Sequence, residues 1–128
     1  MAIRIVRLGT PRARGEGLRI GTVRRPPRGV PRTEFARRDF YDVWYPELAP
    51  SAAAVAQAQR AVTDRAWAAF QRRYRKEMAA PGPRRALQLL AALSHRTDLA
   101  VGCYCEEERR CHRGVLGELL REHGARIA

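Results

Sequence analysis

The sequence predicts an α/β fold, a single layered domain with a small, mostly parallel sheet flanked by helices. Three observations predict this class. Segments rich in β-branched residues alternate with amphipathic segments along the chain, as is typical of α/β proteins. The chain has 128 residues, which suits one domain spanning residues 1–128. Hydrophobic residues make up 45% of the chain, enough to bury a core.

The N-terminal third alternates strands with loops. Residues 3–8 and 18–23 contain alternating β-branched residues, so we expect a strand in each. Between them, residues 9–17 contain three glycines and a proline, which predicts a loop. Residues 24–31 contain three prolines, which remove amide donors and fix φ. We therefore expect a rigid basic loop directly after the second strand.

The middle of the chain predicts helices. Ser51 is a suitable N-cap for the Ala-rich segment that follows it. The next helix carries an apolar stripe at three- and four-residue spacing, which we assign to the core rather than to a base-stacking surface. The members of this stripe are Trp67, Phe70, Tyr74 and Met78. Residues 81–83 read Pro-Gly-Pro and should break the chain before a third helix over residues 84–96.

The C-terminal third predicts a strand, a helix and a short final strand. Residues 99–103 are apolar and should form a buried strand. Residues 112–123 carry a stripe of Leu and Val and should form the last helix, which Gly124 would stop. Residues 125–127 are expected to begin a short strand.

The net charge is +12 and is unevenly distributed. Residues 1–38 contain 11 Arg and two Glu, a net charge of +9. This charge favours a polyanionic partner, either a nucleic acid or a phosphorylated small molecule. The alternative is a solvated basic surface that reflects a compositional bias, since 24 of the 25 basic residues are Arg.

The sequence also predicts the compartment. No segment approaches 18 uninterrupted apolar residues, so we expect no transmembrane helix and no membrane partner. The first residues already resemble a strand, so no signal peptide is expected. Three cysteines in such a chain argue against a disulfide scaffold. We therefore expect a cytoplasmic protein with reduced thiols and without a cofactor.

All three cysteines lie within ten residues, at the predicted junction of a strand and a helix. This segment reads Cys103-Tyr104-Cys105-Glu106-Glu107-Glu108-Arg109-Arg110-Cys111-His112-Arg113. The carboxyl end of a strand is the usual place for a ligand in α/β folds. The sequence therefore predicts a site here more clearly than it predicts a reaction.

Two chemical interpretations of this segment find little support. Three Cys and one His could bind Zn²⁺, but their spacing differs from that of common zinc modules. Adjacent Cys111 and His112 would also have to face one ion from the first turn of a helix, so we expect no bound metal. Cys103 and Arg109 have the spacing of cysteine phosphatases, but the three intervening Glu would repel a phosphate and raise the pKa of the thiol.

An anion site at the start of the last helix is a third interpretation. Free N–H groups and the helix dipole favour negative charge there. Arg113 would hold the anion, His112 would act as acid or base, and Cys111 would be a nucleophile supported by Cys103.

Arginines from another loop would complete this site. Arg24, Arg25 and Arg28 also follow a strand, and we expect them to close over the anion. In the alternative interpretation, Cys103 is simply a buried small residue, His112 caps a neighbouring segment and Arg113 pairs with residues 106–108. The protein would then be a non-catalytic nucleic-acid or protein interaction module that acts through its basic N-terminal face.

Three ordered motifs resemble the domain of unknown function 488 family, the YeaO-like proteins. One branch of that family has a strand ending in Cys, seven further residues, and then Cys-His-Arg before a Leu-rich helix, as in residues 103–113 here. Residues 44–51, with Trp44 and Glu-Leu-Ala-Pro-Ser, and residues 70–78 are similar to two further family motifs. The resemblance covers roughly residues 15–128. It implies the fold, the compartment and the site, but no particular substrate.

Overall fold

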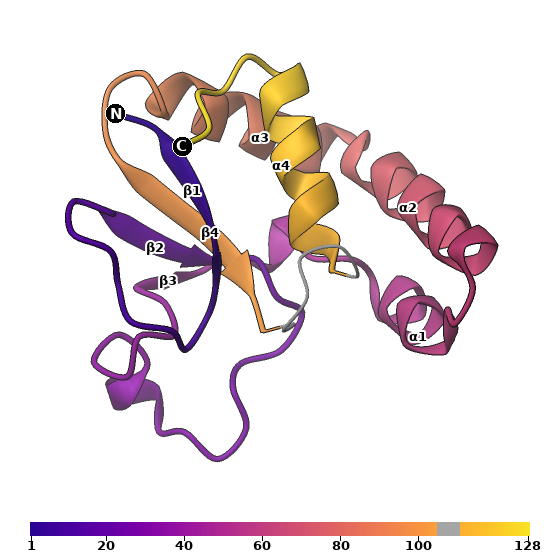
Figure 1. Cartoon of the computed structure of the whole chain (residues 1–128), viewed down its shortest axis with the longest axis horizontal. Helices are drawn as coiled ribbons and strands as arrows, with labels where there is room; N and C mark the ends of the chain where they lie inside the picture. Colours follow the sequence, from indigo (N-terminus) through magenta and orange to yellow (C-terminus); the bar gives the residue numbers. More distant parts are fainter. Residues whose placement is uncertain (105–110) are drawn as a thin grey trace.

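A computed structural model describes residues 1–104 and 111–128. Its strands form an all-parallel sheet in the order β1-β4-β2-β3, which confirms the predicted α/β class (Figure 1). The strands are β1 (Ile3–Arg7), β2 (Leu18–Gly21), β3 (Val43–Trp44) and β4 (Leu99–Cys103).

Strand β4 lies between β1 and β2, although it is the last of the four in the sequence. Leu99 is in register with Ile3 on one side and with Leu18 on the other. All five residues of β4 are buried, as its apolar sequence predicts. Because the sheet is parallel, the carboxyl ends of β2 and β4 lie side by side.

The described residues contain four α-helices, in the predicted order. They are α1 (Ala52–Arg60), α2 (Asp64–Met78), α3 (Pro81–Leu93) and α4 (His112–Glu122), with short 3₁₀ helices at Arg32–Glu34 and Pro46–Leu48. The hydroxyl of Ser51 accepts a hydrogen bond from the amide of Ala54, which confirms the predicted N-cap.

The predicted boundaries of the third helix are wrong. Helix α3 begins at Pro81 and ends at Leu93, three residues earlier at each end than predicted. Proline at the first helical position costs no hydrogen bond, because the amide of that residue would have no intrahelical partner. The predicted final strand is reduced to one bridge between Ile127 and Ile3.

The helices lie on one side of the sheet. Helix α4 packs against β1 and β4, and α3 packs beside α4. Helices α1 and α2 extend away from the sheet as a pair (Figure 1). The predicted stripe of α2 is buried in the main core, which confirms its structural role; its members are Trp67, Phe70, Tyr74 and Met78.

A second apolar cluster lies at the carboxyl ends of the strands. It consists of Leu8, Val23, Tyr41, Cys103 and Cys111. The cysteines therefore belong to a small core of their own, apart from the main one. Within the described part of the chain, none of the helices has the length and apolar character needed to cross a membrane.

Candidate functional site

A cavity of about 810 Å³ opens where the loop after β2 meets the loop after β4. The two strands are neighbours and parallel, so the segments that leave them meet at one edge of the sheet. One face of α1 forms the opposite wall. The lining residues are Val23, Arg24, Arg25, Pro26, Pro27, Arg28, Phe40, Pro50, Ala52, Val55, Ala56, Gln59, Cys103, Tyr104 and His112.

The structure brings together five of the seven residues that the sequence singled out. These five line the cavity and are Arg24, Arg25, Arg28, Cys103 and His112. The other two, Cys111 and Arg113, are buried and do not belong to its lining. Residues from the N-terminal third and from the cysteine segment thus share one cavity.

Arg24 fixes the position of the basic loop. Its Nε donates a hydrogen bond to the carbonyl of Pro50 at 3.0 Å, and its Nη2 donates to the carbonyl of Ala49 at 3.3 Å. These bonds tie the loop to the segment that precedes α1. Arg25 and Arg28 are exposed in the same loop, and the carbonyl of Arg25 accepts a hydrogen bond from the hydroxyl of Tyr104.

The structure places the sulfurs of Cys103 and Cys111 in contact as a disulfide, whereas the sequence predicts reduced thiols. Cys103 ends β4 and Cys111 precedes α4, and the packing of α4 on β4 brings the two side chains together. Their separation of eight residues in the sequence does not reveal this contact. Their Cα atoms are 7.6 Å apart.

His112 is the first residue of α4 and is held from two sides. Its Nε2 lies 2.7 Å from the carbonyl oxygen of Thr22, and its ring meets the ring of Tyr74 edge to face at 5.5 Å. The pKa of His112 is lowered to about 4, mainly by burial and to a smaller extent by the charge of Arg113, against the opposing effect of the Thr22 hydrogen bond. The imidazole is therefore neutral at pH 7.

Arg113 points into the protein next to the disulfide. It is 6% exposed, and its Nη1 lies 3.6 Å from Sγ of Cys103. A guanidinium at this distance favours the thiolate form of a reduced cysteine. The predicted pairing of Arg113 with residues 106–108 lies outside the described residues, as does Cys105.

Sequence reasoning missed several residues of this site. Thr22 orients His112 through its backbone carbonyl, and a backbone group leaves no signal in the sequence. Tyr104 directly follows Cys103 at the strand end, and that position could have indicated it. The wall formed by α1 could also have been found, because its residues recur at helical spacing; they are Ala52, Val55, Ala56 and Gln59.

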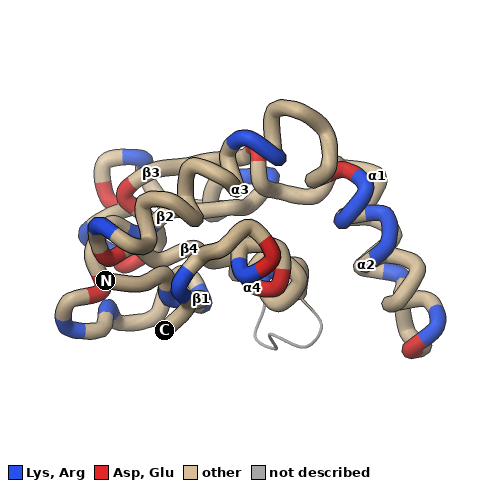
Figure 2. The backbone as a smooth tube through the Cα atoms, turned by 90° about the horizontal axis from the view of Figure 1, so that it is seen from above, with Lys and Arg blue, Asp and Glu red and all other residues tan. Residues whose placement is uncertain are grey.

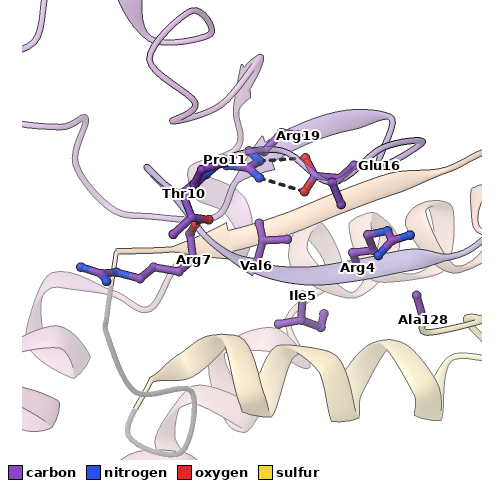
Figure 3. Close-up of a pocket in the computed structure, with 10 residues that line it drawn as sticks. Arg4, Ile5, Val6, Arg7, Thr10, Pro11, Glu16, Arg19 and Ala128 are labelled. Atoms are coloured by element: carbon purple, nitrogen blue, oxygen red, sulfur yellow. Dashed lines mark hydrogen bonds and ion pairs between the residues drawn. The ribbon is translucent and has the colours of Figure 1, made fainter.

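A second cavity, of about 300 Å³, lies along β1 and has a different character (Figure 3). Arg19 on its wall is fully buried. Its Nε and Nη2 donate to the two carboxylate oxygens of Glu16, and its Nη1 donates to the carbonyls of Thr10 and Asp39. Every nitrogen of this guanidinium is engaged, so Arg19 serves the fold rather than a ligand.

Basic residues are not confined to the N-terminal third. Figure 2 shows Lys and Arg along α2, away from the sheet. Part of this charge is structural, because Arg75 of α2 forms ion pairs with Glu118 and Glu122 of α4. The distribution of charge alone therefore does not identify a binding surface. The 810 Å³ cavity combines arginine side chains with a concave shape.

Residues 3–124 match the family described as the active DUF488-N3 subclade. The match spans the loop after β2 and the start of α4, the two segments that meet in the cavity. No curated protein and no solved structure matches the chain.

Proposed function

The chain belongs to the DUF488 family, and we propose that it binds a phosphorylated ligand, a nucleotide or a short nucleic-acid segment, in the cavity at the carboxyl ends of β2 and β4. The convergence of the arginine loop with the cysteine-histidine segment on this cavity supports the proposal. The cavity volume also lies within the range of about 300–1,000 Å³ that is common for small-molecule sites.

Each part of the cavity has a role in this proposal. Arg25 and Arg28 attract and hold the phosphate, while Arg24 positions their loop. Phe40 and Tyr104 supply an aromatic wall on which a base could stack, and their rings meet edge to face at 6.2 Å. Charge at one side and aromatic surface at another are what a nucleotide requires.

The proposal extends to thiol chemistry. When the disulfide is reduced, the neutral imidazole of His112 would accept a proton from the Cys111 thiol, because its Nδ1 lies 3.9 Å from Sγ of Cys111. Arg113 would stabilise the negative charge on these sulfurs. A cytoplasmic location belongs to the same proposal, because a reducing compartment would keep the thiols available.

A non-catalytic basic interaction module is the second candidate. It requires a broad exposed surface of arginine in the first 38 residues. Three of these arginines are already paired with carboxylates: Arg12 with Asp42, Arg19 with Glu16, and Arg37 with Glu34. These pairs reduce the charge that such a surface would present, so the cavity is the better supported site.

Two charge-matched double variants separate the two functions. Arg25→Gln with Arg28→Gln removes two charges from the cavity. Arg14→Gln with Arg38→Gln removes two exposed charges of the same N-terminal third that do not line it. The affinity for ATP and for a fluorescent single-stranded oligonucleotide would be measured by titration at several salt concentrations.

The first pair should weaken binding at least about tenfold, because each charged hydrogen bond contributes about 1.5–3 kcal/mol. The second pair should change the affinity less than about twofold, the effect of screened exposed charges. Equal weakening by both pairs would instead favour the basic interaction module. For the wild type, phosphate contacts predict that the logarithm of the binding constant falls linearly with the logarithm of the salt concentration.

A further inference from the structure

We propose that Cys103, Cys111 and His112 form a binding site for Zn²⁺ when the two thiols are reduced. Among the described residues, the donor atoms of these three side chains all lie within 4.8 Å of one another. Two thiolates and one imidazole are the donors that Zn²⁺ prefers, whereas Mg²⁺ and Ca²⁺ require oxygen. The expectation of no metal assumed that Cys111 and His112 could not face one ion, and their convergence removes that objection.

The spacing of the Cys111–His112 pair fits a shared ion. Sγ of Cys111 and Nδ1 of His112 are 3.9 Å apart. Tetrahedral Zn²⁺ with bonds of about 2.3 Å to sulfur and about 2.0–2.1 Å to nitrogen places such atoms about 3.5 Å apart. A shift of a few tenths of an ångström therefore brings both donors to bonding distance of one ion.

The hydrogen bond of His112 prepares its ring for this role. A backbone carbonyl can only accept, so the Nε2 that contacts the Thr22 oxygen must carry the proton. Nδ1 is then unprotonated and presents its lone pair on the side of Cys111. Metal-binding histidines commonly donate their second N–H to a carbonyl in this way, which fixes both the tautomer and the orientation of the ring.

The backbone spacing of the two cysteines also suits a shared ion. Their Cα atoms are 7.6 Å apart, whereas disulfides usually join Cα atoms about 4.4–6.8 Å apart. Two thiolates on either side of an ion accommodate a wider separation than a direct S–S bond does. The same sulfurs can therefore form either a disulfide or a metal site, but not both at once.

Charge and access complete the site. Two thiolates neutralise one Zn²⁺, so the buried centre carries no net charge. The guanidinium of Arg113, 3.6 Å from Sγ of Cys103, further favours deprotonation of that thiol. Cys103 and His112 both line the 810 Å³ cavity, so a fourth coordination position would be open to a ligand there. This arrangement shares the cavity with the proposed phosphate binding and does not depend on it, whereas it would replace the proposed thiol chemistry, because the same atoms of Cys111 and His112 would bind the ion.

Cobalt titration tests the site directly. The full chain would be reduced under anaerobic conditions with a phosphine and titrated with Co²⁺ as a spectroscopic substitute for Zn²⁺. We expect a thiolate-to-cobalt charge-transfer band that saturates at one ion per chain and disappears when Zn²⁺ is added. Cys111→Ser and His112→Gln should each weaken Co²⁺ binding at least about tenfold, whereas His123→Gln, which removes a histidine outside the site, should not.

A second measurement avoids variants that fail to fold. Oxidised glutathione converts the two thiols to the disulfide and is itself reduced to two glutathione molecules. The oxidised wild type should keep its circular dichroism spectrum but bind no Co²⁺, and reduction should restore binding. Absence of the charge-transfer band in the reduced wild type, or equal binding by the oxidised protein, overturns the metal site. Neither result bears on the phosphate proposal, which is read from the Arg25 and Arg28 variants without metal.

Discussion

Two arginine-containing regions of this molecule differ in what their guanidinium groups contact. Arg19 is fully buried, and Glu16 and two carbonyls engage all of its nitrogens. Arg25 and Arg28 are exposed on a proline-rich loop that lines the larger cavity. The role of an arginine here therefore depends on whether its hydrogen-bond donors are already engaged within the fold, and not on the residue type.

The largest expected effect comes from breaking the buried pair. Glu16→Gln leaves the charge of Arg19 buried without its counterion, which should lower the free energy of unfolding by about 3–5 kcal/mol. Urea denaturation followed by circular dichroism measures this loss. A matched control is Glu34→Gln, which breaks the more exposed pair with Arg37 and should cost less than about 1 kcal/mol. Similar losses for the two variants would show that burial does not make the Arg19–Glu16 pair more important to the fold than an exposed pair.

The second effect concerns His112, a titratable residue that lines the cavity. The pKa of His112 is about 4 in the folded protein, against about 6.5 in the unfolded chain. Between these values the unfolded chain binds more protons, so stability falls as the pH decreases from about 6.5 to about 4. The full loss is about 3 kcal/mol.

Denaturation at pH 7 and pH 4 with the disulfide intact measures this dependence. His112→Gln keeps a donor for the Thr22 carbonyl but cannot titrate, so it should lose less stability than the wild type over the same interval. The difference between the two proteins isolates His112 from the carboxylates that titrate in the same range. An identical pH dependence for both proteins would contradict the assignment of a neutral buried imidazole.

The smallest effect is expected from the exposed arginines. Arg25→Gln with Arg28→Gln should change the free energy of unfolding by no more than about 0.5 kcal/mol, because these side chains lie at the surface. The same urea measurement applies, with Glu16→Gln as the contrasting variant. A loss above about 2 kcal/mol would show that this loop, like Arg19, serves the fold.

Much of the fold could be predicted because periodicity is a local property. The apolar run of β4, the stripe of α2 and the N-cap at Ser51 are each encoded within a few residues. Helix α4 also begins at His112, as the sequence predicts. The error at α3 arose from treating Pro81 as a break, although the first helical position tolerates it.

The candidate site could be predicted only in part, because its geometry is not local. The order of the strands decides that the loops after β2 and β4 meet, and no short pattern encodes that order. The neighbours His112 and Arg113 face different directions from one helical turn, the first lining the cavity and the second buried beside Cys103. Charge favours an exposed position for Arg113, so its burial could not be predicted.

The position of β4 has a consequence for synthesis on the ribosome. Strands β1 and β2 do not pair with each other; each pairs with β4, which is the last strand to be translated. Until residues 99–103 leave the exit tunnel, β1 lacks its main partner and the sheet has a gap at its centre. Pairings between such distant segments form slowly and leave edges open to association. We therefore expect a nascent chain to expose the edges of β1 and β2 until residues 99–103 can pair with them.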